Sequence, residues 1–312
     1  MDIFGKKISK ISLGLSQLNN SLYTKKKFSD NYIQNFIEYS IDKGINCFDT
    51  ANNYGETENI LGKLKNSEKQ KIIISSKAGF IDRKLRNFDQ LYLEKEIGKS
   101  LKKLKTDSID IFYLNKPNNR EIKRNHLVEF CQKMIEKGLI KSAGIIVGSE
   151  SLQDYVYKDK SIKCFSFLYN LINNDFENDM KNSKKFGKFN FVRSPFNSGL
   201  LTNKFYENKN FPRGDYRFSF FSGENFKKKI DKVVYLKKIF KIPNNQLGNF
   251  SLNFLMCNQN VDSCYFGASK KKQVDDLIKL SKKQEFFDEV KMLEIKKIID
   301  FLSKKFKTTD QL

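Results

Sequence analysis

Short runs of apolar, often β-branched residues alternate along the chain with longer segments in which apolar residues recur at helical spacing. The short runs predict strands over 11–13, 46–48, 72–76, 109–114, 140–147, 165–169, 189–192 and 263–266. The longer segments predict helices over 30–43, 58–65, 91–105 and 127–137, near 150–158 and 176–186, twice between 193 and 262, and over 273–282 and 288–304.

This alternation of strands and helices predicts an α/β fold and, within that class, a barrel. Strands that alternate strictly with helices pair in parallel through right-handed crossovers, and eight such units close into a (β/α)8 TIM barrel. Segments 4–8 and 10–13, turned near Gly5 or Ser9, are expected to form a hairpin that caps the amino end, and the last helix is an addition at the other terminus. No linker-like stretch interrupts the chain, so residues 1–312 are expected to form a single domain.

Composition narrows the class of protein. The 58 Lys and Arg residues against 36 Asp and Glu give a net charge of +22. The lysines lie in short clusters throughout the chain, and no nucleic-acid-binding signature accompanies them. Nucleic acid is therefore not expected as a partner. No apolar run is long enough to cross a membrane, and the charged start of the chain does not resemble a secretory signal. Five cysteines without a Cys-x-x-Cys pair are typical of reduced thiols, and a cytoplasmic location is expected.

Other nucleotide-binding and hydrolytic classes lack their motifs here. The chain contains no Gly-x-Gly, no phosphate-binding loop of the Gly-x-x-x-x-Gly-Lys type and no Gly-x-Ser-x-Gly. Its one histidine, His126, is expected at the surface, which leaves no set of ligands for a histidine metal site. Cys257 and Cys264 are expected in the core.

Three residues at predicted strand ends form a chemically coherent set. Asp49 and Tyr54 follow the second strand, and Lys77 follows the third. At the mouth of a barrel, a lysine paired with an aspartate stays protonated and lowers the pKa of a nearby phenol, which can then donate a proton to a carbonyl oxygen. The alternative interpretation is a solvated loop next to an ordinary salt bridge.

The same region resembles the aldo-keto reductase family. Residues 49–62 contain Asp-Thr-Ala-x-x-Tyr-Gly-x-x-Glu-x-x-Leu-Gly, and further similar segments follow in order at 100–110, 138–145, 194–201 and 266–273. The resemblance implies a (β/α)8 barrel that binds NADP(H) without a Rossmann unit. It implies that Tyr54 is the general acid, that Lys77 lowers the pKa of Tyr54 and that Asp49 pairs with Lys77. Asn115 stands where the family usually has histidine. The potassium-channel β subunits, which belong to the family and are slow reductases, also have asparagine at this position.

The resemblance also assigns cofactor positions. At the nicotinamide end the family's Ser-Asn is replaced by Ile146-Val147, its glutamine by Ser166 and its stacking aromatic by Arg193. At the phosphate end the expected contacts are Ser194, Pro195, Gly199 and Leu200 for the pyrophosphate, Ser269 and Lys270 for a 2′-phosphate, and Gln273 and Asp276 for the adenosine.

Three functions are therefore open. The first is an NADP(H)-dependent oxidoreductase that reduces an aldehyde or ketone of a small polar metabolite, such as a sugar or an anionic compound. The second is a redox-inactive barrel that binds a ligand or regulates, and the third is a non-redox acid/base enzyme in which Arg193 holds a carboxylate or phosphate. The segment 203–225, with Arg213, Asp215 and Arg217, is basic and favours an anionic substrate.

Overall fold

A closed barrel of parallel strands organises the computed structural model, which describes residues 2–18, 28–81, 85–202, 218, 222–282 and 287–307. The strand order around the barrel is β10-β3-β4-β5-β6-β7-β8-β9, so each strand lies beside its neighbours in sequence and the last closes on the first. The strands are β3 (Ile11–Gly14), β4 (Cys47–Asp49), β5 (Ile73–Ala78), β6 (Ile109–Asn115), β7 (Ile140–Ile146), β8 (Ile162–Leu168), β9 (Phe189–Arg193) and β10 (Ser263–Gly267). The predicted (β/α)8 barrel is confirmed.

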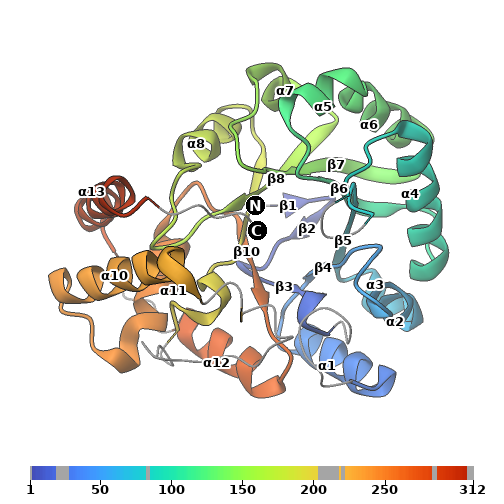
Figure 1. The fold of residues 1–312 in the computed structure, drawn as a ribbon. Helices are drawn as coiled ribbons and strands as arrows, with labels where there is room; N and C mark the ends of the chain where they lie inside the picture. Colours follow the sequence, from blue (N-terminus) through green and yellow to red (C-terminus); the bar gives the residue numbers. More distant parts are fainter. Residues whose placement is uncertain are drawn as a thin grey trace.

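Helices surround the strands on the outside of the barrel (Figure 1). They are α1 (Asp30–Asp42), α2 (Thr57–Lys63), α3 (Asn66–Lys69), α4 (Gln90–Leu104), α5 (Asn119–Arg124), α6 (Leu127–Glu136), α7 (Asp154–Lys158), α8 (Glu177–Lys185), α10 (Gly223–Ile239), α11 (Leu247–Cys257), α12 (Lys271–Lys282) and α13 (Glu289–Lys305). Single 3-10 turns occur at η1 (Leu15–Leu18), η2 (Asn197–Gly199) and η3 (Asn244–Gln246). The short helices α3 and α5 were not predicted, because each is too short and too polar to show a helical period.

The amino terminus forms the expected hairpin with different arms. Strand β1 (Asp2–Ile3) pairs antiparallel with β2 (Lys6–Lys7), and the chain turns at Phe4 and Gly5, whose φ is +72°. The prediction that residues 10–13 form the second arm is wrong, because β3 is used in the barrel. Ile3 and Ile8 are buried against the residues inside the barrel and close its amino end.

Alternate strand residues point inwards and fill the barrel. This inner cluster contains Cys47, Ile73, Ile111, Tyr113, Ile146, Cys164, Phe191 and Tyr265. The Tyr113 ring fits only because β7 carries Gly144 beside it, where a Cβ atom would lie 2.4 Å from a ring carbon. The interior is therefore a packed core, and space for a ligand exists only at its ends.

The glycine that ends the family-like motif has a packing role. A Cβ atom on Gly62 would lie 2.1 Å from the backbone carbonyl oxygen of Lys103, so this glycine lets α2 pack directly on α4. Glu58, earlier in the motif, is fully buried and accepts a hydrogen bond of 2.6 Å from Ser76 Oγ. These contacts hold the loop after β4 in place beside β5.

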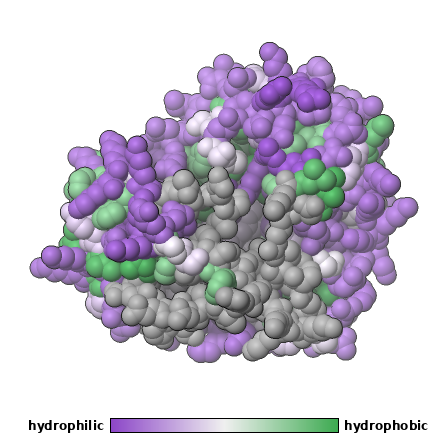
Figure 2. Space-filling model, viewed as in Figure 1, coloured by the Kyte–Doolittle hydropathy of each residue, from purple (hydrophilic) through white to green (hydrophobic). Residues whose placement is uncertain are grey.

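The outer surface carries most of the charge. Seen from the direction of Figure 1, the described residues around the rim are mainly hydrophilic, with small apolar patches between them (Figure 2). His126 is exposed, as predicted; Cys264 is buried and Cys257 half-buried. Within the described ranges, no helix is long and apolar enough to cross a membrane and no group of three metal-ligating side chains occurs.

Candidate active site at the carboxyl ends of the strands

A buried ion pair joins the ends of β4 and β5. Lys77 Nζ lies 2.6 Å from Asp49 Oδ2 and donates a second hydrogen bond of 2.7 Å to the Thr50 carbonyl. The Lys77 side chain is 5% exposed and that of Asp49 12%. Ser75 Oγ donates to the other Asp49 oxygen at 2.9 Å, so the carboxylate accepts from two side chains and is held in one orientation.

Tyr54 lies directly against this ion pair. The Lys77 ammonium stands over the Tyr54 ring, 4.6 Å from its centroid, which is cation–π distance. The loop that carries Tyr54 is tied down by backbone hydrogen bonds from Thr50 to Ser75 and from Tyr54 to Ala51. The predicted convergence of Asp49, Lys77 and Tyr54 is therefore present in the structure.

Hydroxyl groups form the floor below the ion pair. Tyr265 lies 3.4 Å from Ser75 Oγ and 3.3 Å from the Tyr113 hydroxyl. Burial raises the pKa of both phenols well above the ordinary value, so they stay neutral at any physiological pH. Tyr54, half-buried at the rim, is thus the phenol next to the lysine that a ligand at the mouth can reach.

Asn115 lies at the end of β6, two residues beyond the inward-pointing Tyr113. Side chains two apart on a strand share a face, so Asn115 also points to the mouth. Within the part of the chain that the structure describes, its side-chain amide makes no hydrogen bond to protein. The amide is positioned to donate to a ligand oxygen but cannot titrate.

The predicted nicotinamide positions meet at the ends of β7, β8 and β9. Ser166 is buried on β8 beside Ile146, and Arg193 Nη2 donates a hydrogen bond of 2.8 Å to the Val147 carbonyl. The Val147 N–H is also used, since it donates to the Ser166 carbonyl at 2.9 Å. In this arrangement both backbone groups of Val147 already make a hydrogen bond within the protein, and its apolar side chain offers none to a carboxamide.

The turn after β9 has an unusual backbone. Ser194 (φ 54°), Asn197 (φ 44°) and Ser198 (φ 57°) adopt left-handed conformations that cost energy for residues other than glycine. Asn170, fully buried, donates to the Ser194 carbonyl at 3.0 Å and stabilises the turn. Of the predicted pyrophosphate contacts that surround it, Pro195 and Leu200 are buried, whereas Ser194 is half-buried and Gly199 exposed.

At the start of α12, two backbone N–H groups donate to one side chain. Gln273 Oε1 accepts from the backbone N–H of Ser269 at 2.9 Å and of Lys270 at 3.0 Å, which is how this chain caps the helix. Asp276 is exposed and ion-paired with Lys272 at 3.3 Å. The Lys270 side chain is exposed, and a phosphate in place of the Gln273 oxygen would meet two N–H donors and an ammonium group.

Three residues at the mouth were not predicted. Ser75 orients Asp49. Lys116 follows the end of β6, and Arg86, in the loop after β5, donates from Nη1 to the Lys116 carbonyl at 3.1 Å. Burial, together with the positive charges of Arg193 and Arg86, lowers the pKa of Lys116 to about 7. The only available sequence signal was the position of Lys116 directly after Asn115. The basic segment 203–225 lies outside the described residues except for 218 and 222–225.

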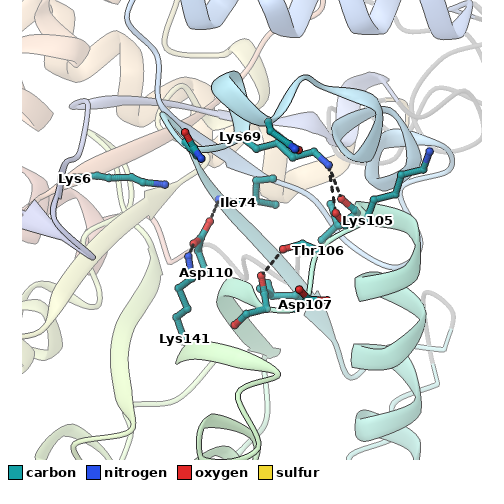
Figure 3. A pocket seen from close by; sticks show the side chains of 13 residues that line it. Lys6, Lys69, Ile74, Lys105, Thr106, Asp107, Asp110 and Lys141 are labelled. Carbon is teal, nitrogen blue, oxygen red and sulfur yellow. Dashed lines mark hydrogen bonds and ion pairs between the residues drawn. The ribbon is translucent and has the colours of Figure 1, made fainter.

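A separate cavity of about 510 Å³ opens at the opposite, amino end of β5, β6 and β7 (Figure 3). Three of its lysines contact the protein: Lys6 donates to the Ile72 carbonyl at 2.6 Å, Lys69 to the Gly62 carbonyl at 2.8 Å, and Lys141 pairs with Asp110 at 2.6 Å. These contacts stabilise the lower rim of the barrel. The cavity lies at the other end of the barrel from Tyr54 and Lys77.

Known proteins share both this fold and this sequence pattern. The model of the Aldo/keto reductase family matches residues 10–300. An uncharacterized oxidoreductase, YqkF, from Bacillus subtilis is 26% identical over 299 residues, which are 90% of each chain. The aldo-keto reductase yakc [NADP(+)] from Schizosaccharomyces pombe is 23% identical over 72% of this chain and 70% of its own length. The structure of the glycerol dehydrogenase AKR11B4 from Gluconobacter oxydans superposes with a TM-score of 0.74 at 21% identity, covering 99% of this chain and 96% of the other.

A closed parallel barrel with an aspartate, a lysine and a tyrosine in contact at its mouth is thus common to the structure and to the sequence resemblance. With a family model that spans nearly all of its length, the chain belongs to the aldo-keto reductase family and is an oxidoreductase.

Proposed function

We propose that this protein reduces the aldehyde or ketone group of a small polar metabolite with NADP(H), and that Tyr54 is the general acid. The observation that carries the proposal is the contact of Tyr54 with Lys77, whose ammonium is itself held by Asp49. We further propose that the enzyme acts in the cytoplasm as a single domain, without nucleic acid or membrane as a partner. The cysteine content and the scattered charge support this.

The ion pair makes the tyrosine a better acid. As a phenol gives up its proton, negative charge develops on its oxygen, and a fixed cation nearby stabilises that charge. Lys77 uses two of its N–H groups on Asp49 and Thr50 and faces the Tyr54 ring with its remaining surface. Asp49 is a positioning residue here, because it touches Lys77 and not the ligand.

The remaining groups orient the substrate carbonyl. Its oxygen is held between the Tyr54 hydroxyl and the Asn115 amide, so that the proton passes from Tyr54 to the oxygen as the carbon is reduced. The cofactor, when bound, supplies the hydride. Asn115 fits a donor role that does not depend on pH, and the packed tyrosine floor excludes water from below.

The two ends of the proposed cofactor site differ in fit. At the start of α12, the N–H groups of Ser269 and Lys270 suit a phosphate that displaces the Gln273 side-chain oxygen, and a relative named for NADP(+) supports the choice of cofactor. At the end of β7, the Val147 N–H is used by Ser166 and the Val147 carbonyl already accepts from Arg193, so a carboxamide would share that carbonyl with Arg193.

The test is the turnover of Tyr54→Phe with NADPH and a panel of small aldehydes. A lost general acid lowers kcat about 100-fold or more. Tyr155→Phe, an exposed tyrosine on α7, is the matched control and should retain wild-type turnover. NADPH binding, followed by cofactor fluorescence, should be the same in both variants. Unchanged kcat in Tyr54→Phe would exclude the assigned acid.

The engaged Val147 backbone favours a second candidate function. In it, the barrel binds a ligand without redox turnover, and Arg193 occupies the space of the nicotinamide. Saturable NADPH binding without oxidation by any carbonyl compound would support this second function over the first.

A further inference from the structure

Three cationic side chains, those of Lys116, Arg193 and Arg86, lie near the strand end that carries Asn115, close enough for the two arginines to act on the charge of Lys116. Arg193 reaches from β9 to the Val147 carbonyl, and Arg86 reaches from the loop after β5 to the Lys116 carbonyl. Lys116 packs against the next loop, where a Cβ atom on Gly148 would lie 3.5 Å from the Lys116 Cβ. The loop after β5, the end of β6 and the end of β9 thus bring positive charge next to Asn115.

Lys116 is held in place by its backbone. Its N–H donates to the Ile146 carbonyl at 3.0 Å and its own carbonyl accepts from Arg86. It adopts a left-handed φ of 61°, although residues before a proline strongly favour extended conformations. Strain of this kind at a strand end persists only where the surroundings enforce it, and it fixes the direction of the side chain.

No carboxylate of the described residues neutralises the Lys116 ammonium, which makes no hydrogen bond or ion pair within those ranges. The nearest acidic residues along the chain are used elsewhere: Glu121 pairs with Arg86 at 3.2 Å, and Asp110 pairs with Lys141 at 2.6 Å. A cation that is partly withdrawn from water beside other cations is unfavourable unless an anion joins it.

We propose that Lys116 and Arg193 form an anion site beside the catalytic residues, and that the enzyme's substrate is a carbonyl compound bearing a carboxylate or phosphate group. That the anion belongs to a substrate rests on the proposed reductase function. The anion site itself does not depend on that function. Arg86 contributes charge, while its guanidinium remains on Glu121 and the Lys116 carbonyl.

Binding is tested first, without cofactor and without turnover. Calorimetric titrations use butanoate as the carboxylate probe, inorganic phosphate as the phosphate probe and butanamide as the uncharged control. Wild type should bind an anion and not butanamide, and Lys116→Met should weaken that binding about tenfold or more, as expected for a charge-assisted hydrogen bond. Lys123→Met, which removes an exposed lysine from α5, should bind as wild type does.

Lys116→Arg separates a binding role from a structural one. It keeps the charge at all pH values, so binding should survive and lose the pH dependence that a lysine of lowered pKa imposes. Loss of binding in Lys116→Arg with an intact fold by circular dichroism, or equal weakening in Lys123→Met, would overturn the proposal.

Turnover then identifies the source of the anion. The ratio of kcat/KM for 4-oxobutanoate over butanal, and for glycolaldehyde phosphate over glycolaldehyde, should exceed one for the preferred anion and fall about tenfold in Lys116→Met. Butanoate that competes with NADPH instead of with the carbonyl substrate would assign the site to the cofactor and overturn the inference. A wild type that binds the anion but oxidises no NADPH would refute the proposed function and leave the anion site standing.

Discussion

The buried pair of Asp49 and Lys77 predicts a large and specific stability change. Lys77→Met leaves the Asp49 carboxylate, 12% exposed, with the Ser75 hydroxyl and no cation. Removing one partner of a buried ion pair typically costs about 3–5 kcal/mol, because the remaining charge stays desolvated. We expect the free energy of unfolding to fall by about 3 kcal/mol.

A matched pair on the other rim provides the control. Lys141 and Asp110 are also 2.6 Å apart and Asp110 is also 12% exposed, but the Lys141 side chain is 46% exposed. Water can take the place of Lys141, so Lys141→Met should cost about 1 kcal/mol or less. The two variants differ mainly in the solvent access of the deleted ammonium.

Chemical denaturation followed by far-UV circular dichroism measures both changes, since the chain has no tryptophan. In the double variant Asp49→Asn/Lys77→Met the amide can still accept from Ser75, and no charge is left unpaired. It should regain at least about 1.5 kcal/mol over Lys77→Met. Equal losses in Lys77→Met and Lys141→Met, or a double variant no more stable than Lys77→Met, would refute the reasoning.

Three further predictions concern packing, titration and thiol reactivity. Gly62→Ala should destabilise the fold by about 2 kcal/mol or more, because the added Cβ would lie 2.1 Å from the Lys103 carbonyl oxygen. Gly98→Ala, at a position on α4 with open space around it, should stabilise the fold by about 0.5–1 kcal/mol. Denaturant midpoints of the two variants test both values. Butanoate affinity should be full below pH 7 and weaken as pH rises through about 7, since the pKa of Lys116 is about 7 and only its protonated form attracts the anion; titrations at several pH values check this. Iodoacetamide should modify Cys257 first in the folded protein, because the other four thiols are buried; peptide mass mapping identifies the modified residue.

Much of the fold could be predicted from apolar periodicity. Every barrel strand overlaps a predicted one, because buried parallel strands are continuous apolar runs bounded by polar loops. The strand ends were less accurate where the apolar run and the hydrogen-bonded ladder differ. Strand β5 extends past the predicted end at 76 through Lys77 and Ala78, because the Lys77 ammonium is paired with Asp49 inside the barrel.

The contact of Asp49, Lys77 and Tyr54 was predictable because these residues lie at or directly after consecutive strand ends. Asp49 and Lys77 meet in the structure as the topology requires, and Tyr54 follows within one short loop. Lys116 was not predictable, since its environment comes from Arg86 and Arg193, which are distant in sequence, and from a left-handed backbone that no local pattern signals.

The central claim is that the chain transfers hydride from NADPH to a carbonyl group beside Tyr54. Wild type incubated with NADPH deuterated on the reactive carbon, and with each member of a carbonyl panel that includes 4-oxobutanoate and glycolaldehyde phosphate, tests it directly. Mass spectrometry of the alcohol products should show one deuterium per molecule, and Tyr54→Phe should slow its appearance about 100-fold. Saturable NADPH binding with no deuterated product from any carbonyl compound would contradict the claim.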